Sequence, residues 1–371
     1  MILGLSILAL VLAAIPAAMF LKNLPLFCVD LAVPVGDPPA ISVLIPARDE
    51  ESGIERCVRS VLASESVDVE VLVIDDQSTD QTAAIVNRIA EEDSRVQCIA
   101  GSGLPDGWNG KQHACYRLSE TAKHPYLVFL DADVRLAADA LAKLVARKRS
   151  SNVALLSAFP HQETGTILEQ WIIPMMHFIL LGYLPFDRMR SSTDASFASG
   201  CGQLFLTSAE EYSAAGTHKA IMSSRHDGVK LPRAYRSHGM ATDVVDGTTL
   251  AECRMYRSAS EVIRGVLKNA TEGIANPRLI VVFTVLLIGS SVLPLLMLIS
   301  SVMLQQTTAA VISLIALVLG HLPRFLGAAR FRQSWAGAIF HSLATGLFVS
   351  LQWIALVGHL FGKQVQWRGR Q

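Results

Sequence analysis

Two pairs of neighbouring carboxylates stand out in the sequence. Asp75 and Asp76 open the stretch Asp-Asp-Gln-Ser-Thr-Asp that ends at Asp80, and Asp131 and Asp133 are separated by one alanine. Each pair follows a short apolar run that is typical of a buried strand. On an extended backbone the i, i+2 spacing turns Asp131 and Asp133 to the same side. Paired carboxylates of this kind suit Mg²⁺ or Mn²⁺, which can bridge a diphosphate and neutralise the charge that builds on it as it leaves.

Each acidic cluster also has a simpler explanation. The residues around Asp80 can cap a following helix, and Asp131 and Asp133 can open a turn. Two acidic strand ends in one α/β pattern favour the nucleotide-diphosphate site, because open α/β sheets bind ligands at the carboxyl ends of their strands.

The elements that would position these carboxylates follow a βαβ pattern. We expect strands at Ile41–Pro46, Val69–Ile74 and Tyr126–Leu130, a helix from Glu51 to about Ala63, and another that begins near Asp80. The near-continuous apolar strands indicate a sheet that is covered on both faces. The fold class is therefore α/β, of a nucleotide-binding type, over residues 38–270.

The composition excludes some function classes. Of 371 residues, 51% are hydrophobic and 17% charged, so part of the chain must meet lipid. Lys plus Arg and Asp plus Glu both number 32, which leaves no basic surplus for nucleic acid. The six cysteines form no CxxC pair, which argues against a zinc site or a disulfide framework and fits a reducing, cytosolic setting.

Hydrophobic segments lie at both ends of the chain. Ile2–Leu21 predicts an N-terminal transmembrane anchor over residues 1–22, ending at Lys22, with a cleaved signal peptide as the alternative. Residues 279–362 predict a C-terminal transmembrane region of two to three helices, in the segments Leu279–Leu304, Thr307–Pro323 and Trp335–Phe361. Residues 171–186 predict a membrane-surface helix or, alternatively, a buried helix of the catalytic domain.

The C-terminal charges complicate the topology. Lys22 favours a cytoplasmic position for the domain that follows it. Three crossings from there would leave Lys363, Arg368 and Arg370 outside, against the positive-inside tendency. Either one segment is re-entrant or the tendency fails here.

Several motifs together resemble one enzyme family. Ile41–Glu50, Asp75–Asp80, Gly110-Lys111 and Asp131-Ala-Asp133 resemble the GT-A domain of family 2 glycosyltransferases. The stretch Leu104–Lys111 and the hydrophobic tail resemble, more narrowly, the branch of ceramide glucosyltransferases and of hopanoid-associated and carotenoid glycosyltransferases.

The resemblance implies a role for individual residues of the donor site. By motif, Pro46, Arg48 and Glu50 would line the nucleoside pocket, Asp76 would contact the base, and Lys111 would approach the nucleotide. Asp131 and Asp133 would face ribose, phosphate and a Mg²⁺ or Mn²⁺ ion. Gly200 and Gly202 resemble the glycine-rich stretch beside the donor sugar, although a plain loop explains them as well.

The resemblance also implies a catalytic base. His226-Asp227 occupies the position of the family's Glu-Asp pair, so Asp227 would accept the proton of the acceptor hydroxyl in an inverting single displacement. A helix-capping role is the alternative for Asp227. Because His226 stands where Glu is usual, any help that this Glu gives is in doubt.

One family signature is missing. The QxxRW motif has no counterpart, and the corresponding region contains Arg254, Arg257 and Lys268 instead. These residues would bind the diphosphate or, alternatively, meet anionic lipid beside the membrane. The loss of QxxRW favours a single transfer over processive polymer synthesis.

The expected protein is thus an inverting, metal-dependent glycosyltransferase of a bacterial inner membrane, with its catalytic domain in the cytoplasm. It would move a sugar from a UDP- or GDP-linked donor to a membrane lipid of sphingolipid, hopanoid or carotenoid type. Two alternatives remain: transfer to a polyprenyl phosphate, and a catalytically silent membrane scaffold that binds nucleotide sugars.

Overall fold

The computed structural model describes residues 1–32 and 36–361, which form two compact units. The sheet unit comprises Phe27–Glu163 and Phe186–Met255. The helical unit comprises Met1–Leu26, Thr164–Pro185 and the chain from Tyr256 onward. Each unit is described by itself.

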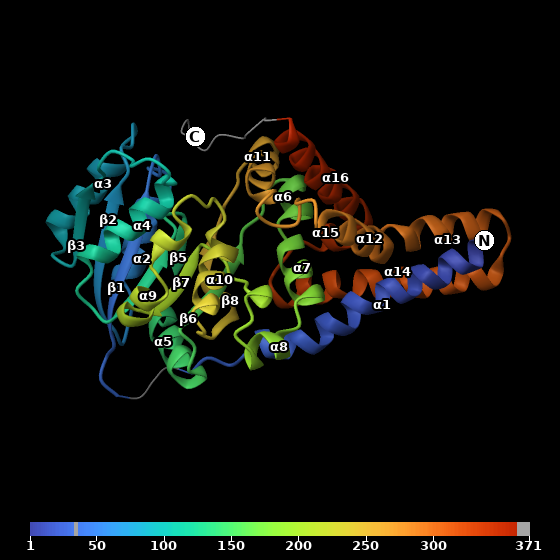
Figure 1. Ribbon diagram of the computed structural model, residues 1–371, viewed down its shortest axis with the longest axis horizontal. Coiled ribbons are helices and arrows are strands. Elements are labelled where there is room, and N and C mark those ends of the chain that lie inside the picture. The colour runs from blue at the N-terminus through green and yellow to red at the C-terminus, as the bar shows by residue number, and fades with distance from the viewer. Residues whose placement is uncertain (33–35, 362–371) are drawn as a thin grey trace. The chain divides into compact units, whose positions relative to one another are not determined.

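The sheet unit is built on one mixed sheet of eight strands (Figure 1). The strand order is β3-β2-β1-β4-β7-β6-β8-β5. β1, β2, β3 and β4 run parallel, whereas β7 is antiparallel to both β4 and β6. The strands are β1 (Ala40–Ala47), β2 (Asp68–Asp75), β3 (Val96–Ala100), β4 (Tyr126–Leu130), β5 (Val134–Leu136), β6 (Leu155–Gln162), β7 (Leu204–Ser208) and β8 (Thr242–Cys253).

Alternating side chains of the strands divide the core into two layers. On β1, Val43 and Ile45 join one layer with apolar residues of α2, α3 and α5, while Leu44 joins the other with residues of α4, α9 and α10. Helices therefore cover both faces of the sheet, as its continuous apolar strands require. The helices of this unit are α2 (Ile54–Leu62), α3 (Thr82–Glu92), α4 (Gly110–Thr121), α5 (Ala140–Ser151), α8 (Phe186–Ser191), α9 (Ala209–Ala214) and α10 (Asp227–Ser237), with short 3-10 turns at Ala195–Phe197 and His218–Ile221.

The fold class expected from the sequence is confirmed, although only β1, β2 and β4 of the eight described strands were predicted. Tyr126–Leu130 is the fourth strand along the chain and not the third, because Val96–Ala100 forms an edge strand beside β2. Only Val96 of that strand is buried, so it lacks the apolar run that marks the others. An edge strand with one mostly solvated side leaves little hydrophobic signal in the sequence.

Within the described part of the helical unit, three helices are long and apolar enough to cross a membrane: α1 (Ile2–Phe27), α14 (Thr307–Arg330) and α16 (His341–Leu360). Two further helices, α12 (Ile280–Ser291) and α13 (Leu293–Met303), meet at a bend of 46° and would together make a fourth. The remaining helices are α6 (Ile167–Ile172), α7 (Met175–Tyr183), α11 (Ala259–Ala270) and α15 (Trp335–Ile339).

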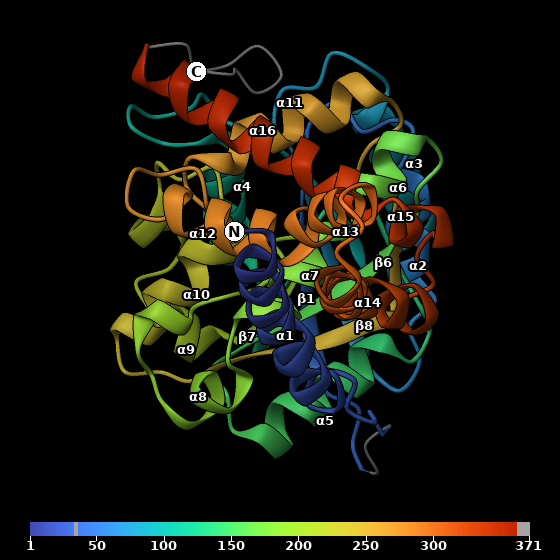
Figure 2. The ribbon, with the colours of Figure 1, turned by 90° about the vertical axis from the view of Figure 1, so that its right-hand side faces the viewer.

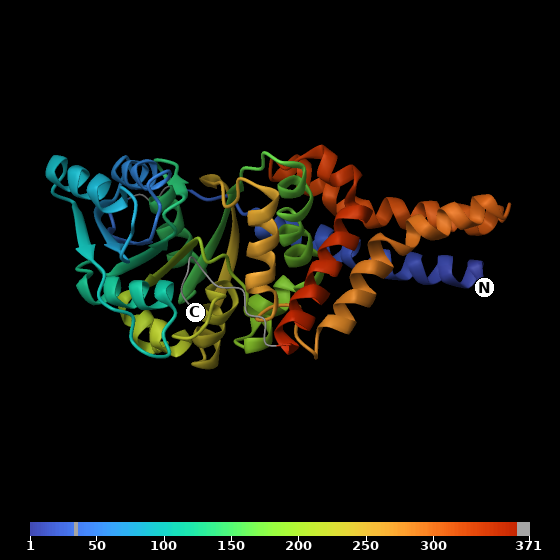
Figure 3. The same cartoon turned by 90° about the horizontal axis from the view of Figure 1, so that it is seen from above.

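These long helices do not share one direction. Figure 2 shows α14 nearly end-on while α16 is seen along its length, and Figure 3 shows α16 crossing the direction of α1 and α14. α13 runs beside α14 in a hairpin, whereas α16 packs on α11 and α12. Hydropathy alone cannot separate such a crosswise helix from a spanning one.

The apolar segment 171–186 is divided between α6 and α7. Ile173-Pro174 separates the two helices, and Met175 and Phe178 of α7 are buried against Leu287 and Val349 of the helical unit. This apolar packing, and not the core of the sheet unit, accounts for the hydrophobicity of α7.

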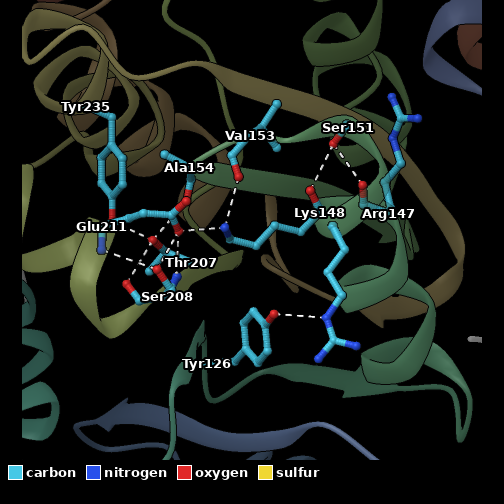
Figure 4. Close-up of polar contacts among 11 residues, drawn as sticks. Tyr126, Arg147, Lys148, Ser151, Val153, Ala154, Thr207, Ser208, Glu211 and Tyr235 are labelled. Carbon is cyan, nitrogen blue, oxygen red and sulfur yellow. Dashed lines mark hydrogen bonds and ion pairs between the residues drawn. The ribbon is translucent and has the colours of Figure 1, made fainter. Parts of the chain in front are cut away.

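A buried ion pair ties α5 to the start of α9 in the sheet unit (Figure 4). Lys148 Nζ lies 2.5 Å from Glu211 Oε2 and donates a hydrogen bond of 2.9 Å to the carbonyl of Val153. Glu211 also completes a capping box with Ser208 at the N-terminus of α9. The lysine side chain is only 8% exposed, so its loss would leave the carboxylate and the carbonyl without this donor.

We predict that Lys148→Met lowers the free energy of unfolding by about 1–3 kcal/mol, because it removes a buried donor from two acceptors. Thermal unfolding of the purified protein in detergent measures this change. Arg88→Gln, at the exposed ion pair with Glu55, is the matched control and should change little. Equal stability of the Lys148→Met variant and the wild type would contradict the assignment.

Candidate active site

The loops after β1 and β2 are joined at the carboxyl edge of the sheet. Ala47 pairs with Asp75 in the parallel register, which brings the residues that follow each strand together. Arg48 Nη1 lies 3.7 Å from Asp76 Oδ2 and 3.3 Å from the Asp76 carbonyl oxygen. The two residues expected in the nucleoside pocket therefore form one polar unit, with Pro46 half-buried at the end of β1.

Hydrogen bonds between the residues after β1 and those after β2 hold this loop pair in shape. Asp49 Oδ1 accepts the backbone N–H of Thr79 at 2.7 Å, and Thr82 Oγ1 accepts that of Glu50 at 2.8 Å. Asp80 accepts the backbone N–H of Thr82. Asp80 thus lies just before the first turn of α3, as in the capping alternative, while Asp76 and Glu50 lie toward the strand ends.

Lys111 is the centre of the site. It lies in the first turn of α4, whose N-cap Asn109 accepts the Lys111 backbone N–H. Its Nζ lies 2.6 Å from Asp131 Oδ1 and 2.8 Å from Asp227 Oδ2, and donates to the Gly202 carbonyl oxygen at 3.2 Å. One ammonium group therefore joins the end of β4, the glycine-rich stretch and the start of α10.

The electrostatics of this cluster are strongly coupled. Burial raises the pKa of Asp131 to about 6, and the nearby carboxylates of Asp133 and Asp227 act in the same direction while Lys111 opposes them. Burial also acts to raise the pKa of Asp227, but Lys111 outweighs it and holds that pKa below the usual value. Burial acts to lower the pKa of Lys111, yet the two carboxylates keep it well above the ordinary value. Asp227 is therefore ionised at neutral pH, as a proton acceptor must be.

A side chain at Gly200 or Gly202 would clash with neighbouring residues of the site. A Cβ on Gly202 would lie 2.1 Å from Asp227 Oδ1, and one on Gly200 would lie 2.7 Å from the ring of Phe205. Gly228 is similarly constrained, because its Cβ would lie 2.8 Å from the Gly200 carbonyl oxygen. The glycine-rich stretch thus packs directly on the residue expected to be the base.

The carboxylates fit a hard divalent cation. Asp133 and Asp227 are both within electrostatic range of Asp131, and Lys111 forms ion pairs with Asp131 and Asp227. Among the residues that the structure describes, no group of three or more His, Cys, Asp or Glu side chains forms a complete protein cage for a metal ion. Mg²⁺ and Mn²⁺ are commonly held by one or two carboxylates together with water and substrate phosphates, which is the donor set offered here.

Sequence reasoning missed a buried polar network beside Asp131. Gln203 accepts a hydrogen bond of 2.6 Å from Gln162 Nε2 and approaches Cys253 with its own amide nitrogen at 2.8 Å. The Gln203 carbonyl accepts the backbone N–H of Asp131. These residues come from β6, the start of β7 and the end of β8, and no local motif links them.

The basic residues after β8 are divided between the units. Arg254 lies in the sheet unit directly after β8, and Arg257 lies in the helical unit at the entry to α11. The Arg257 backbone N–H donates to Glu261 Oε2 at 2.8 Å. Their expected contact with a diphosphate remains a prediction.

Comparisons with known proteins agree with this geometry. Residues 42–212 match the family model "Glycosyl transferase family 2". The chain is 28% identical over 344 residues to 4,4'-diaponeurosporenoate glycosyltransferase of Staphylococcus aureus strain USA300, covering 90% of this chain and 88% of that protein. The strain MRSA252 protein of the same name is 29% identical over 257 residues, covering 68% and 66%.

A solved structure supports the fold independently. The mannosyltransferase PcManGT from Pyrobaculum calidifontis, in complex with GDP-Man and Mn²⁺, superposes with a TM-score of 0.56 at 16% identity, covering 98% of this chain and all of that one. The sheet, the cluster around Lys111 and the matched family model lead to one conclusion: residues 42–212 form a glycosyltransferase family 2 domain on a GT-A-like fold, in a chain whose described residues also include helices long and apolar enough to span a membrane.

Proposed function

We propose that this chain is an inverting, metal-dependent hexosyltransferase that moves a sugar from a UDP- or GDP-linked donor to a membrane lipid. The observation that carries the proposal is that Asp227 and Asp131 form ion pairs with the same lysine, Lys111. A proton acceptor and a diphosphate-binding group are thus side by side. A single displacement needs no enzyme nucleophile, because the acceptor oxygen attacks the sugar directly.

In the proposed reaction, Asp227 accepts the proton of the acceptor hydroxyl as that oxygen attacks the anomeric carbon. The bond between this carbon and the diphosphate oxygen breaks, and the nucleoside diphosphate leaves with the electron pair. In the structure Lys111 forms an ion pair with Asp227. Diphosphate oxygens would compete for the Lys111 ammonium group. Donor binding would therefore release the Asp227 carboxylate from Lys111, so that it can accept the proton of the acceptor hydroxyl.

Asp131 and Asp133 would hold Mg²⁺ or Mn²⁺. When bound, the ion neutralises charge on the departing diphosphate. Arg48, Glu50 and Asp76 would bind the nucleoside beside Pro46, and Arg254 and Arg257 would bind the diphosphate. Gly200 and Gly202 would leave room for the donor sugar.

A lipid acceptor is supported by the apolar helices and by the similarity to 4,4'-diaponeurosporenoate glycosyltransferases. We propose an acceptor of sphingolipid, hopanoid or carotenoid type. Transfer to a polyprenyl phosphate would not need a base, because a phosphate acceptor is already ionised. A silent scaffold would bind the donor without turnover.

We further propose that the catalytic domain lies in the cytoplasm at a bacterial inner membrane. In this topology α1, the bent pair α12–α13, and α14 cross the membrane, and α16 lies in its plane. The crosswise direction of α16 supports this arrangement (Figure 2). With this arrangement α16 ends on the cytoplasmic side, the side that the positive-inside tendency favours for basic residues. Lys363, Arg368 and Arg370, on which the sequence-based topology argument rested, lie outside the described residues.

The Asp227→Asn variant tests the base. We expect kcat to fall by about 10²–10⁴-fold, because an amide cannot accept the proton, while donor binding changes by only a few fold. Product formation from native lipid extract, followed by mass spectrometry, measures this loss and also identifies the acceptor. Asp139→Asn, before α5 and away from the site, should retain full activity. Full activity of Asp227→Asn on a polyprenyl phosphate would instead support that alternative.

The Asp133→Ala variant tests the metal site. Manganese binding, followed by the electron paramagnetic resonance of free Mn²⁺, should weaken at least about tenfold because Mg²⁺-type sites depend on one or two carboxylates. Chelation should abolish wild-type activity, and added Mn²⁺ or Mg²⁺ should restore it. Asp93→Ala, at the end of α3, serves as the control. Unchanged Mn²⁺ binding in Asp133→Ala would rule out this pair as the ligands.

Cysteine labelling tests the topology. We expect a membrane-impermeant maleimide to label Gln305→Cys, between α13 and α14, in intact cells, and Phe361→Cys, after α16, only in permeabilised cells. The six native cysteines all lie in the sheet unit and should stay unlabelled from outside, which provides the background control. Labelling of Phe361→Cys in intact cells would mean that α16 crosses the membrane.

A further inference from the structure

A buried arginine lies within the apolar helices of the helical unit. Arg324, in the second half of α14, is 2% exposed and is the largest fully buried side chain among the described residues. Charged residues in membrane helices are costly and, where they occur, face partners or binding sites. The surroundings of this guanidinium therefore need an explanation.

The contacts of Arg324 satisfy little of its hydrogen-bonding capacity. Nη2 donates to the Gly337 carbonyl oxygen at 3.2 Å, and Nη1 approaches the Met175 sulfur, a weak acceptor, at 3.1 Å. Nε has no partner within the described part of the chain. No carboxylate in residues 1–32 or 36–361 forms an ion pair with it. A guanidinium carries five N–H donors in a planar fork, and most of these are unused.

Polar side chains lie beside this charge. His341 is fully buried, with Nε2 3.0 Å from Ser291 Oγ and Nδ1 3.3 Å from Thr345 Oγ1, and its ring lies 5.4 Å from that of His321. These groups provide hydrogen-bonding partners but no negative charge. We call Arg324, His321, His341, Ser291 and Thr345 the intramembrane polar cluster.

The surface next to the intramembrane polar cluster is apolar and exposed. Phe325 follows Arg324 on α14, and Trp335, Ile339 and Phe340 flank Gly337, with exposures between 37% and 59%. A Cβ on Gly337 would lie 2.1 Å from the Gln170 carbonyl oxygen, so glycine permits the close approach that aims the Gly337 carbonyl at Arg324. Exposed aromatic and aliphatic side chains on such helices suit the hydrocarbon chain of a lipid.

We propose that the intramembrane polar cluster is a binding site for the carboxylate head group of a membrane-resident lipid, held by Arg324. The two oxygens of a carboxylate match the guanidinium fork, and one negative charge balances one positive charge. A phosphate head group, with up to two charges, would be only half neutralised by one guanidinium group. The site does not depend on sugar transfer.

A structural role alone is the competing explanation. In that case Arg324 would serve only to fasten α15 to α14 through the Gly337 carbonyl. Its removal would lower the stability of the protein but would not change its preference between charged and neutral lipids.

Binding of radiolabelled oleate to the purified full-length protein in neutral detergent tests the proposal, with oleyl alcohol and oleyl phosphate as competitors. We expect saturable oleate binding that oleyl alcohol displaces at least about tenfold less well. Arg324→Gln should weaken oleate binding at least about tenfold, and Arg330→Gln, an exposed arginine on the same helix, should leave it unchanged. Arg324→Lys, which keeps the charge but not the fork, should give an intermediate loss and serves if Arg324→Gln does not fold.

Three results would overturn the proposal. Unchanged oleate binding in folded Arg324→Gln or Arg324→Lys would support the structural role. Equal displacement by oleyl alcohol would show that the head group is not recognised. Tighter binding of oleyl phosphate than of oleate would assign the site to phosphate. None of these results depends on the transfer reaction, so they leave the proposed function to its own tests.

Discussion

The contact of Lys111 with Asp131 and Asp227 is the interaction on which the rest of the site depends. Asp131 ends a strand of the parallel half of the sheet, and Asp227 begins a helix almost a hundred residues later. Without a cation between them, two buried carboxylates would repel each other and one would take up a proton. Lys111 holds the pKa of Asp227 below its usual value and keeps Asp131 and Asp227 together.

The sheet makes this contact possible because β4 has a parallel neighbour on one side and an antiparallel neighbour on the other. β1 and β4 are parallel neighbours, so the residues that follow them reach the same edge. β7 then returns antiparallel to β4 and brings the Gly200–Gly202 stretch to the end of β4. The site thus lies where the parallel and antiparallel halves meet, and the glycines provide the space that Asp227 needs.

The parts of this structure that depend on local pattern could be predicted from the sequence. β1, β2 and β4 are apolar runs, and the residues after them carry the acidic motifs. β3 was missed because an edge strand buries few side chains, and the ion pairs of Lys111 were missed because nothing in the sequence encodes contacts between distant segments. The resemblance to a family selected Lys111, Asp131 and Asp227 individually, whereas only the fold brings them together. No local sequence motif predicted the hydrogen bond between Gln162 and Gln203 or the buried position of Arg324.

The anomeric configuration of the product tests the central claim most directly. Asp227 is placed as a single base, and no step of the proposed mechanism forms a covalent sugar–enzyme intermediate. The glycolipid made from an α-linked nucleotide sugar should therefore carry a β-linked sugar when its anomeric coupling is measured by nuclear magnetic resonance. An α-linked product would contradict single displacement and would require another role for Asp227.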